Sequence, residues 1–193
     1  MMTLVDFADP GLVILPAHRL VRSLPQSSLD NLNNGLNTLF TVEELPIGEL
    51  GAHGQLDVWL SEDDGEVKLL LYGTGRERLS RLTLRDFNAV RPMMPHFHSD
   101  LYQKLDVSIV DHVILEDLLG LTHESAGGYV DYTNDAIEAI KRVREHEFQL
   151  AVILNPVKPQ AIKAIADSGD RMPRKSTYFY PKVPAGIVFY RFK

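Results

Sequence analysis

Residues 9–21 read DPGLVILPAHRLV, a turn followed by an apolar, largely β-branched stretch that leads to a histidine and an arginine. Proline presets φ and glycine tolerates positive φ, so residues 8–11 have the chemistry of a tight turn. An apolar stretch also precedes this turn, at residues 3–7. We therefore predict that residues 3–7 and 12–21 pair as a β-hairpin.

The sequence that follows indicates a helix and a second hairpin. After Pro25, leucines recur at helical spacing and predict a helix through Leu39, capped by Ser27 or Ser28. Two runs of alternating apolar and polar residues, separated by the acidic residues 61–66, predict the hairpin. The apolar members are Leu56, Val58 and Leu60 in the first run and Val67, Leu69 and Leu71 in the second.

Beyond this hairpin the pattern changes to alternating helices and strands. Residues 85–98 contain prolines without periodicity and predict a connector between two lobes, 1–90 and 99–193. Periodicity and end signals then predict, in chain order, a helix at 99–119, a strand at 129–132, a helix from Ala136, a strand at 149–154, a helix at 159–167 and a strand at 186–192. The expected fold class is mixed α+β (α/β), with a β-hairpin-rich lobe followed by an α/β lobe with a mixed sheet.

The composition excludes several classes of protein. With 193 residues and 45% hydrophobic content, the chain can bury a core without disulfides, and it has no cysteine for disulfide, thiolate or zinc-thiolate chemistry. No apolar run approaches the ~18 residues of a membrane helix. The net charge of −6 argues against nucleic acid as the main partner. We expect a cytoplasmic protein that binds neither membrane nor nucleic acid.

The most unusual segment is residues 170–182, DRMPRKSTYFYPK, in which cations, hydroxyls and phenols stand between prolines. Arginine offers a forked donor, lysine a compact charge, and serine or threonine a hydroxyl, which together suit a phosphoryl group. The candidate ligand-binding residues here are Arg174, Lys175, Ser176, Thr177 and Lys182. The alternative is a solvated loop whose tyrosines pack on the core.

Two further positions are candidates for the site. His18 could act as acid or base near neutral pH and Arg19 could bind an anion, although a structural histidine is an equal alternative. Asn155, at the end of a predicted strand, could bind a ligand or begin a turn. His96 and His98 lie in the proline-rich connector and do not make up a ligand set, so we predict no metal site.

Four segments together resemble a known family. Residues 9–21, 118–120, 151–156 and above all 172–182 are similar to the C-terminal half of a prokaryotic family known only as domain of unknown function number ten-fifteen. Ala17 stands where that family often has threonine. Its members are longer, and their N-terminal half carries an Asp-Gly-His-His-Arg type motif that this sequence lacks. The resemblance, and an apolar stretch that begins at the first residues, imply the C-terminal portion of a longer protein.

The missing motif resembles that of the superfamily of ParB-type nucleotide hydrolases, sulfiredoxin and free-serine kinases. This resemblance implies nucleotide-dependent phosphoryl transfer, with ATP or ADP and Mg²⁺ as cofactors and the N-terminal half as partner. The basic segment would then hold phosphate or an acidic substrate, and His18 and Arg19 would complete the cleft; no acidic ligand for the metal is evident. The alternative is a non-catalytic module that docks on the N-terminal domain or another partner.

Overall fold

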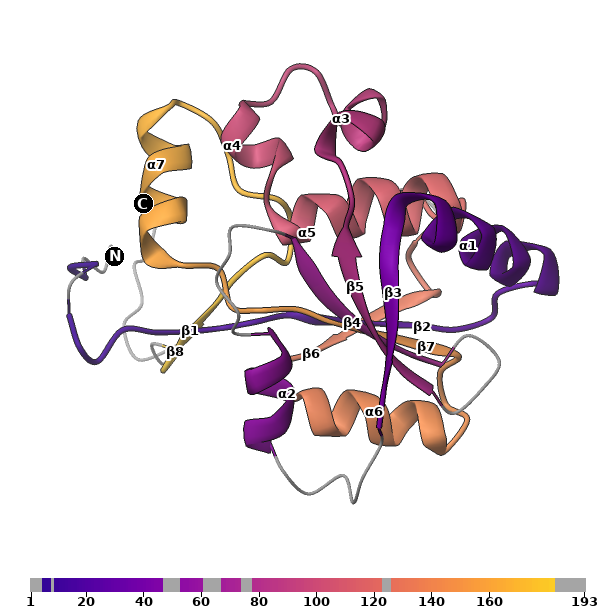
Figure 1. Cartoon of the computed structure of the whole chain (residues 1–193). Coiled ribbons are helices and arrows are strands. Elements are labelled where there is room, and N and C mark those ends of the chain that lie inside the picture. Colours follow the sequence, from indigo (N-terminus) through magenta and orange to yellow (C-terminus); the bar gives the residue numbers. More distant parts are fainter. Residues whose placement is uncertain are drawn as a thin grey trace, which may run out of the picture.

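The fold is built on one sheet. The structure, a computed structural model, describes residues 5–7, 9–46, 53–60, 67–73, 78–122 and 126–182. Six strands pair in the order β3-β5-β4-β7-β2-β6 (Figure 1), and each neighbouring pair is antiparallel. They are β2 (His18–Val21), β3 (Phe40–Leu45), β4 (Lys68–Gly73), β5 (Arg78–Leu84), β6 (Val130–Thr133) and β7 (Leu150–Ile153). The mixed α+β class is confirmed, and the described strands form an antiparallel sheet rather than a mixed one.

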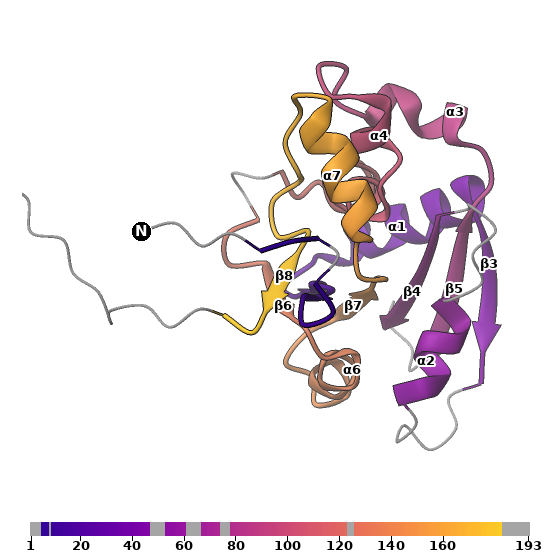
Figure 2. The same ribbon diagram turned by 90° about the vertical axis from the view of Figure 1, so that its left-hand side faces the viewer.

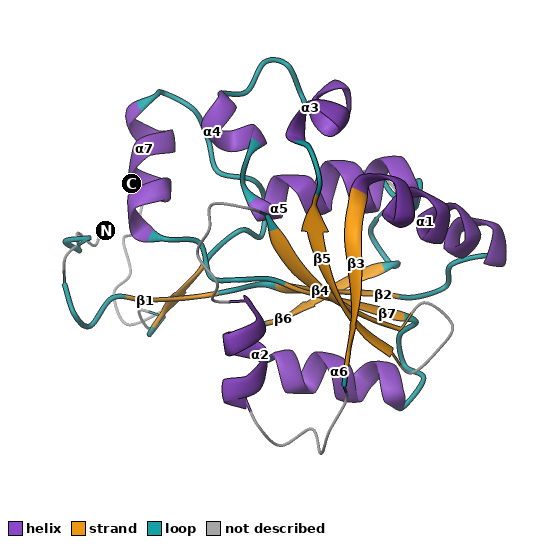
Figure 3. Cartoon of the chain, viewed as in Figure 1, coloured by secondary structure: helices purple, strands orange, loops and turns teal. Residues whose placement is uncertain are grey.

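Helices cover both faces of the sheet (Figure 3). On one face lie α1 (Gln26–Leu39) and the π-helix η2 (Ile109–Leu118), and on the other lie α2 (His53–Leu60) and α6 (Ala136–Arg144). The remaining helices are α3 (Phe87–Val90), η1 (Arg91–Met93), α4 (Asp100–Gln103), α5 (Asp106–Ser108) and α7 (Pro159–Asp167). The sheet therefore separates two hydrophobic cores.

Alternation along β2 decides where its polar residues point. Leu20 belongs to the core under α2 and α6, whereas Val21 belongs to the core under α1 and η2. Successive side chains of a strand point to opposite faces. His18 therefore lies on the α2 and α6 side of the sheet, and Arg19 lies on the η2 side.

A separate two-stranded ribbon joins distant parts of the chain. In it β1 (Val13–Leu15) pairs with β8 (Tyr178–Tyr180), and Figure 2 shows this ribbon on the side of β6, away from β3. Residues 3 and 4 of the hairpin predicted from residues 3–7 and 12–21 lie outside the described residues. The rest of that prediction is wrong, because residues 5–7 form no strand and β1 and β2 find their partners in the last third of the chain. The predicted turn itself is present, since Leu12 N donates to Asp9 O at 3.0 Å.

Two other predictions also need correction. Residues 53–60 form helix α2 rather than a strand, and the expected turn at 61–66 lies outside the described residues. The single helix expected at 99–119 is instead the sequence α4, α5 and η2, although Ser99 caps α4 as predicted and Gly120, with φ of 71°, ends η2.

The other predicted elements within the described residues are confirmed as α1, β4, β6, α6, β7 and α7. The predicted cap of α1 is wrong, because the helix already begins at Gln26 after Pro25, so Ser27 and Ser28 lie inside it. The strand expected at 186–192 lies outside the described residues. Strands from both predicted lobes, 1–90 and 99–193, share the central sheet, and the division of the chain into lobes stays a prediction.

Candidate functional site

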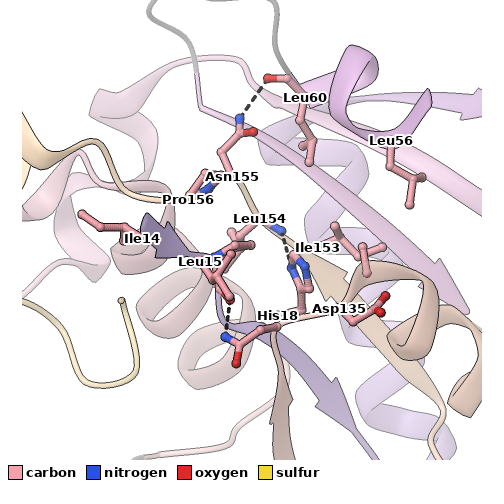
Figure 4. Close-up of a pocket in the computed structure, with 13 residues that line it drawn as sticks. Ile14, Leu15, His18, Leu56, Leu60, Asp135, Ile153, Leu154, Asn155 and Pro156 are labelled. Atoms are coloured by element: carbon pink, nitrogen blue, oxygen red, sulfur yellow. Dashed lines mark hydrogen bonds between the residues drawn. The ribbon is translucent and has the colours of Figure 1, made fainter. Parts of the chain in front are cut away.

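A cavity of about 380 Å³ lies on the α2 and α6 side of the sheet (Figure 4). Pockets for small organic ligands begin at about 300 Å³ and are walled mainly by apolar side chains. The apolar wall includes Leu15, Leu56, Leu60, Ile153 and Leu154. Leu56 and Leu60 are four residues apart on α2, so the helix turns both toward the end of β7. The cavity is thus shaped by one helix face and one strand end.

His18 is the most deeply buried polar residue of this cavity, with 3% of its surface exposed. Its Nδ1 accepts a hydrogen bond from the backbone N–H of Leu154 at 3.2 Å, as Figure 4 shows. Burial first, and the charge of Arg19 second, lower the pKa of His18 to about 4, while Asp135 opposes the shift. At pH 7 the ring is therefore neutral, and since Nδ1 is an acceptor, the proton is on Nε2.

The Nε2–H group is the donor of His18 that the protein leaves unused. No hydrogen bond to it is found within the described residues, and it is not among their fully buried atoms without a partner, so it keeps some exposed surface, and His18 itself lines the cavity. A ligand that covered this N–H group without accepting from it would leave a buried donor unpaired, which is costly. The site consequently offers one donor that a ligand could use.

The other polar groups of the cavity are fixed by the backbone around them. Asn155 Nδ2 donates to Leu60 O at 2.9 Å, which leaves its Oδ1 as an acceptor. Asn134 Nδ2 donates to Pro16 O at 2.6 Å. Asp135 caps α6 by accepting from two backbone N–H groups, at 2.8 and 3.0 Å. Because these side chains are already held, the cavity is preformed.

Arg19, the second residue proposed for the cleft, lies on the opposite face of β2 and does not line this cavity. It is fully buried, and its Nε and Nη2 lie 3.2 and 3.0 Å from Asp111 Oδ1. Its Nη1 also donates to Ala17 O at 2.5 Å. The structure therefore separates the side chains of His18 and Arg19, and a role for Arg19 in ligand binding stays a prediction.

The basic segment lies near Arg19 rather than in the cavity. Lys175 Nζ and Arg19 Cζ stand 5.5 and 5.6 Å from the centre of the Tyr132 ring, and Lys182 Nζ lies 4.2 Å from that of Tyr178. Lys175 also has φ of 52°, a left-handed conformation that a lysine adopts only when its surroundings impose it.

The predicted ligand-binding residues of this segment differ in exposure. Arg174, Lys175 and Lys182 are exposed, Thr177 is half-buried and Ser176 is buried. None of these five lines the cavity, whereas Asn155 does. The two regions meet at β1, since Leu15 lines the cavity and pairs with Tyr178 at the end of the segment.

A polar network behind the basic segment was not predictable from sequence patterns. Asp170 Oδ1 lies 2.6 Å from His98 Nδ1, and Asp170 Oδ2 accepts from Ser99 N at 2.7 Å. Burial raises the pKa of Asp170, but hydrogen bonds from Ser99, His98 and Arg171 outweigh it and hold that pKa well below its usual range. No spacing could have indicated a contact across 72 residues.

This network continues toward η2. The His98 ring stacks on Tyr102, with ring centres 3.7 Å apart. Tyr102 Oη lies 3.2 Å from His112 Nε2, and His112 Nδ1 lies 2.7 Å from Glu116 Oε2. Burial, followed by the nearby carboxylates, raises the pKa of Tyr102 to about 12, so the phenol keeps its proton.

Neither a metal cluster nor a membrane helix is found where the structure describes the chain. Within those ranges, no group of three histidine, aspartate or glutamate side chains is arranged to hold a metal ion. Across the same residues, every helix is too short or too polar to cross a membrane.

Comparison with known proteins gives a family and a fold. The family described as "Protein of unknown function (DUF1015)" matches residues 1–108. A conserved hypothetical protein from Pyrococcus furiosus is 14% identical with a TM-score of 0.51, covering 94% of this chain and 62% of that one. A free serine kinase in complex with AMP is 15% identical with a TM-score of 0.50, and the match covers 92% of this chain and 57% of the kinase chain. No curated protein matches. The chain thus spans about three fifths of the length of these solved structures.

Proposed function

The chain belongs to the DUF1015 family of proteins of unknown function, and from this premise we propose that it binds an adenine nucleotide beside His18. In this proposal the chain is the ligand-binding part of a nucleotide-dependent, phosphotransferase-like enzyme. Its activity would require the remainder of a longer protein, so we expect no turnover from this chain alone.

The observation that carries the proposal is the preformed cavity. Its apolar walls suit the faces of a nucleobase, and the His18 donor and Asn155 acceptor suit its edge. A free serine kinase that shares the fold is described in complex with AMP, which supports an adenine nucleotide as the ligand to test first.

The phosphate groups would extend toward the basic segment. Because Leu15 both lines the cavity and pairs with Tyr178, a nucleotide whose base fills the cavity can direct its phosphates along β1. Exposed Lys175, Arg174 and Lys182 would then neutralise charge, which is the main requirement of phosphoryl transfer. The hydroxyls of Ser176 and Thr177 would serve as further ligands to a phosphate or acidic substrate.

No group of three or more carboxylate or histidine side chains among the described residues is arranged to hold a metal ion. Mg²⁺ in phosphoryl-transfer sites is usually held by one or two carboxylates together with substrate phosphates, so it would enter with the nucleotide. We therefore assign no step to the metal within this chain.

The proposal is tested by calorimetry with AMP, ADP, ATP and phosphoserine. We expect saturable binding of an adenine nucleotide, weakened about ten-fold when Ala136→Leu fills the cavity or Lys175→Ala removes a cation. Ala166→Leu and Lys163→Ala, at exposed positions of α7, are the matched controls and should leave binding unchanged. Absence of binding by this chain and by the full-length protein would reject the nucleotide site.

A specific surface favours the alternative of a non-catalytic docking module. Val13 and Tyr180 are paired across the β1–β8 ribbon, and both are exposed, at 42% and 54%. Exposed tyrosines beside cations are typical of protein interfaces. If Val13→Glu abolishes association with the rest of the full-length protein while no phosphorylated ligand binds either form, docking becomes the better account of this chain.

A further inference from the structure

The charges around the cavity indicate which part of a nucleotide it accepts. Throughout the described residues, the polar lining consists of His18, Asn134, Asp135 and Asn155, with no lysine or arginine. A phosphate placed there would lie near the Asp135 carboxylate without a cation to neutralise it. The cavity therefore suits a neutral, flat, partly polar group rather than an anion.

His18 defines what that neutral group must supply. Its Nδ1 is occupied by the N–H of Leu154, and its Nε2–H has no partner in the part of the chain that the structure describes. A ligand that fills the cavity must offer an acceptor to this N–H group, because otherwise it would bury the donor without a partner. The complementary group is an acceptor without charge, and the ring nitrogen of a purine is such an acceptor.

We propose that His18 is a specificity-determining residue that recognises the adenine base by donating from Nε2–H to a ring nitrogen. Asn155 Oδ1, left free because Nδ2 bonds Leu60 O, would accept from the exocyclic amino group. This inference rests on the proposed nucleotide site, and it assigns His18 to recognition of the base rather than to proton transfer.

Two substitutions separate the nitrogens of His18. In His18→Asn the side-chain oxygen can replace Nδ1 as the acceptor for Leu154 N–H, but nothing replaces Nε2–H. In His18→Gln the longer amide can replace Nε2–H, but the bond to Leu154 is lost. Both remove the imidazole, so a preference among ligands that persists in His18→Gln and is lost in His18→Asn reports on the donor rather than on the ring or on the bond to Leu154.

The experiment compares AMP with its 1-deaza, 3-deaza and 7-deaza analogues, each of which replaces one ring nitrogen by a C–H group. With the unsubstituted protein we expect one analogue to bind about ten-fold more weakly than AMP and the other two to bind within about two-fold, as loss of one hydrogen bond predicts. This preference should persist in His18→Gln and vanish in His18→Asn. If His18→Gln does not fold, as its melting temperature would show, His18→Asn alone decides.

The outcomes distinguish the inference from the function on which it rests. If AMP binds but all three analogues bind equally well, or if His18→Asn keeps the preference, the inference is wrong and the nucleotide site stands. If adenosine binds as tightly as AMP and shows the deaza preference, the base recognition is confirmed and the phosphate site is rejected. If neither AMP nor adenosine binds, both proposals fail.

Discussion

Arg19 and Asp111 form a buried ion pair that joins β2 to η2. The guanidinium is fully buried and donates three hydrogen bonds to the carboxylate, at 3.2 Å from Nε and at 3.0 and 3.3 Å from Nη2. Removing one member of such a pair leaves a buried charge and typically costs about 3–5 kcal/mol. We expect Asp111→Ala to lower the free energy of unfolding by this amount in urea titrations. The double variant Arg19→Met with Asp111→Leu should recover most of the loss, and a single variant that costs under about 1 kcal/mol would contradict this account.

His18 makes the stability depend on pH. Its pKa is lowered from 6.5 to about 4 in the folded chain, so between these values the unfolded chain binds a proton that the folded chain does not. The free energy of unfolding should therefore decrease as the pH falls from 6.5 to 4, by up to about 3 kcal/mol. His18→Asn should remove this part of the pH dependence in urea titrations at successive pH values.

Asp106 provides a control of opposite sign. Burial raises its pKa to about 6, against the effects of its own backbone N–H and of Lys158. In this case the folded chain holds the proton between pH 4 and 6, so this residue favours the folded state as the pH falls. The free energy of unfolding should therefore fall more steeply with decreasing pH in Asp106→Asn than in the unsubstituted protein. In His18→Asn it should fall less steeply. Identical pH profiles for the two variants would contradict both assignments.

Among the elements, the contact between Asp170 and the start of α4 holds the basic segment at its N-terminal end. The Asp170 carboxylate bonds His98 and the backbone N–H groups of Ser99 and Arg171, all within 2.7 Å, directly before the cations. Loss of a hydrogen bond to a charged group costs about 1.5–3 kcal/mol, which raises the population of an open segment about ten-fold or more. We expect His98→Ala to accelerate trypsin cleavage after Arg171, Arg174 and Lys175 accordingly.

The matched variant for this contact is His98→Asn. Its amide N–H can replace Nδ1–H, so cleavage of the basic segment should return toward the original rate. Cleavage after Arg144, at the end of α6, serves as the internal control, because a general loss of stability would accelerate both. Equal cleavage of the segment in His98→Ala and the unsubstituted protein would show that the contact does not hold it.

Sequence patterns predicted the helices and strands that are determined by nearby residues. They failed where one segment fits both a strand pattern and a helix pattern. Leu56 and Leu60 fit both an alternating strand and one face of a helix, and Val58, at 58% exposure, shows that the helix is right. The hairpin prediction failed because β1 pairs with β8, a choice made by tertiary packing. Likewise, nothing in the sequence distinguishes the π-helix η2 from an α-helix.

The candidate site shows the same division. Alternation along β2 was readable, so the opposite directions of His18 and Arg19 follow once the strand is recognised. The position of Asn155 at a strand end also pointed to the cavity that it lines. The cavity wall formed by α2 was not predictable, because that segment was taken for a strand. The separation of the basic segment from His18 was not predictable either, because it depends on the non-local pairing of β1 with β8.

At the scale of the whole molecule, one sheet connects residues from both ends of the chain. In its middle β4 pairs with β7, with Leu70 opposite Ile153 and Leu71 opposite Val152, so each hydrophobic core contains residues from both halves. Neither residues 1–90 nor residues 99–193 can complete a core without the other. We therefore expect one cooperative unfolding transition.

Two signals test this expectation. The fluorescence of Trp59, the one tryptophan of the sequence, reports on the α2 and α6 core on which it packs. Far-UV circular dichroism reports on the helices of both faces. The two signals should give the same midpoint in urea. Separate midpoints would show that the lobes unfold independently. Coincident midpoints would mean that a ligand bound beside α2 stabilises the entire described fold, because any ligand of the native state then shifts the whole equilibrium.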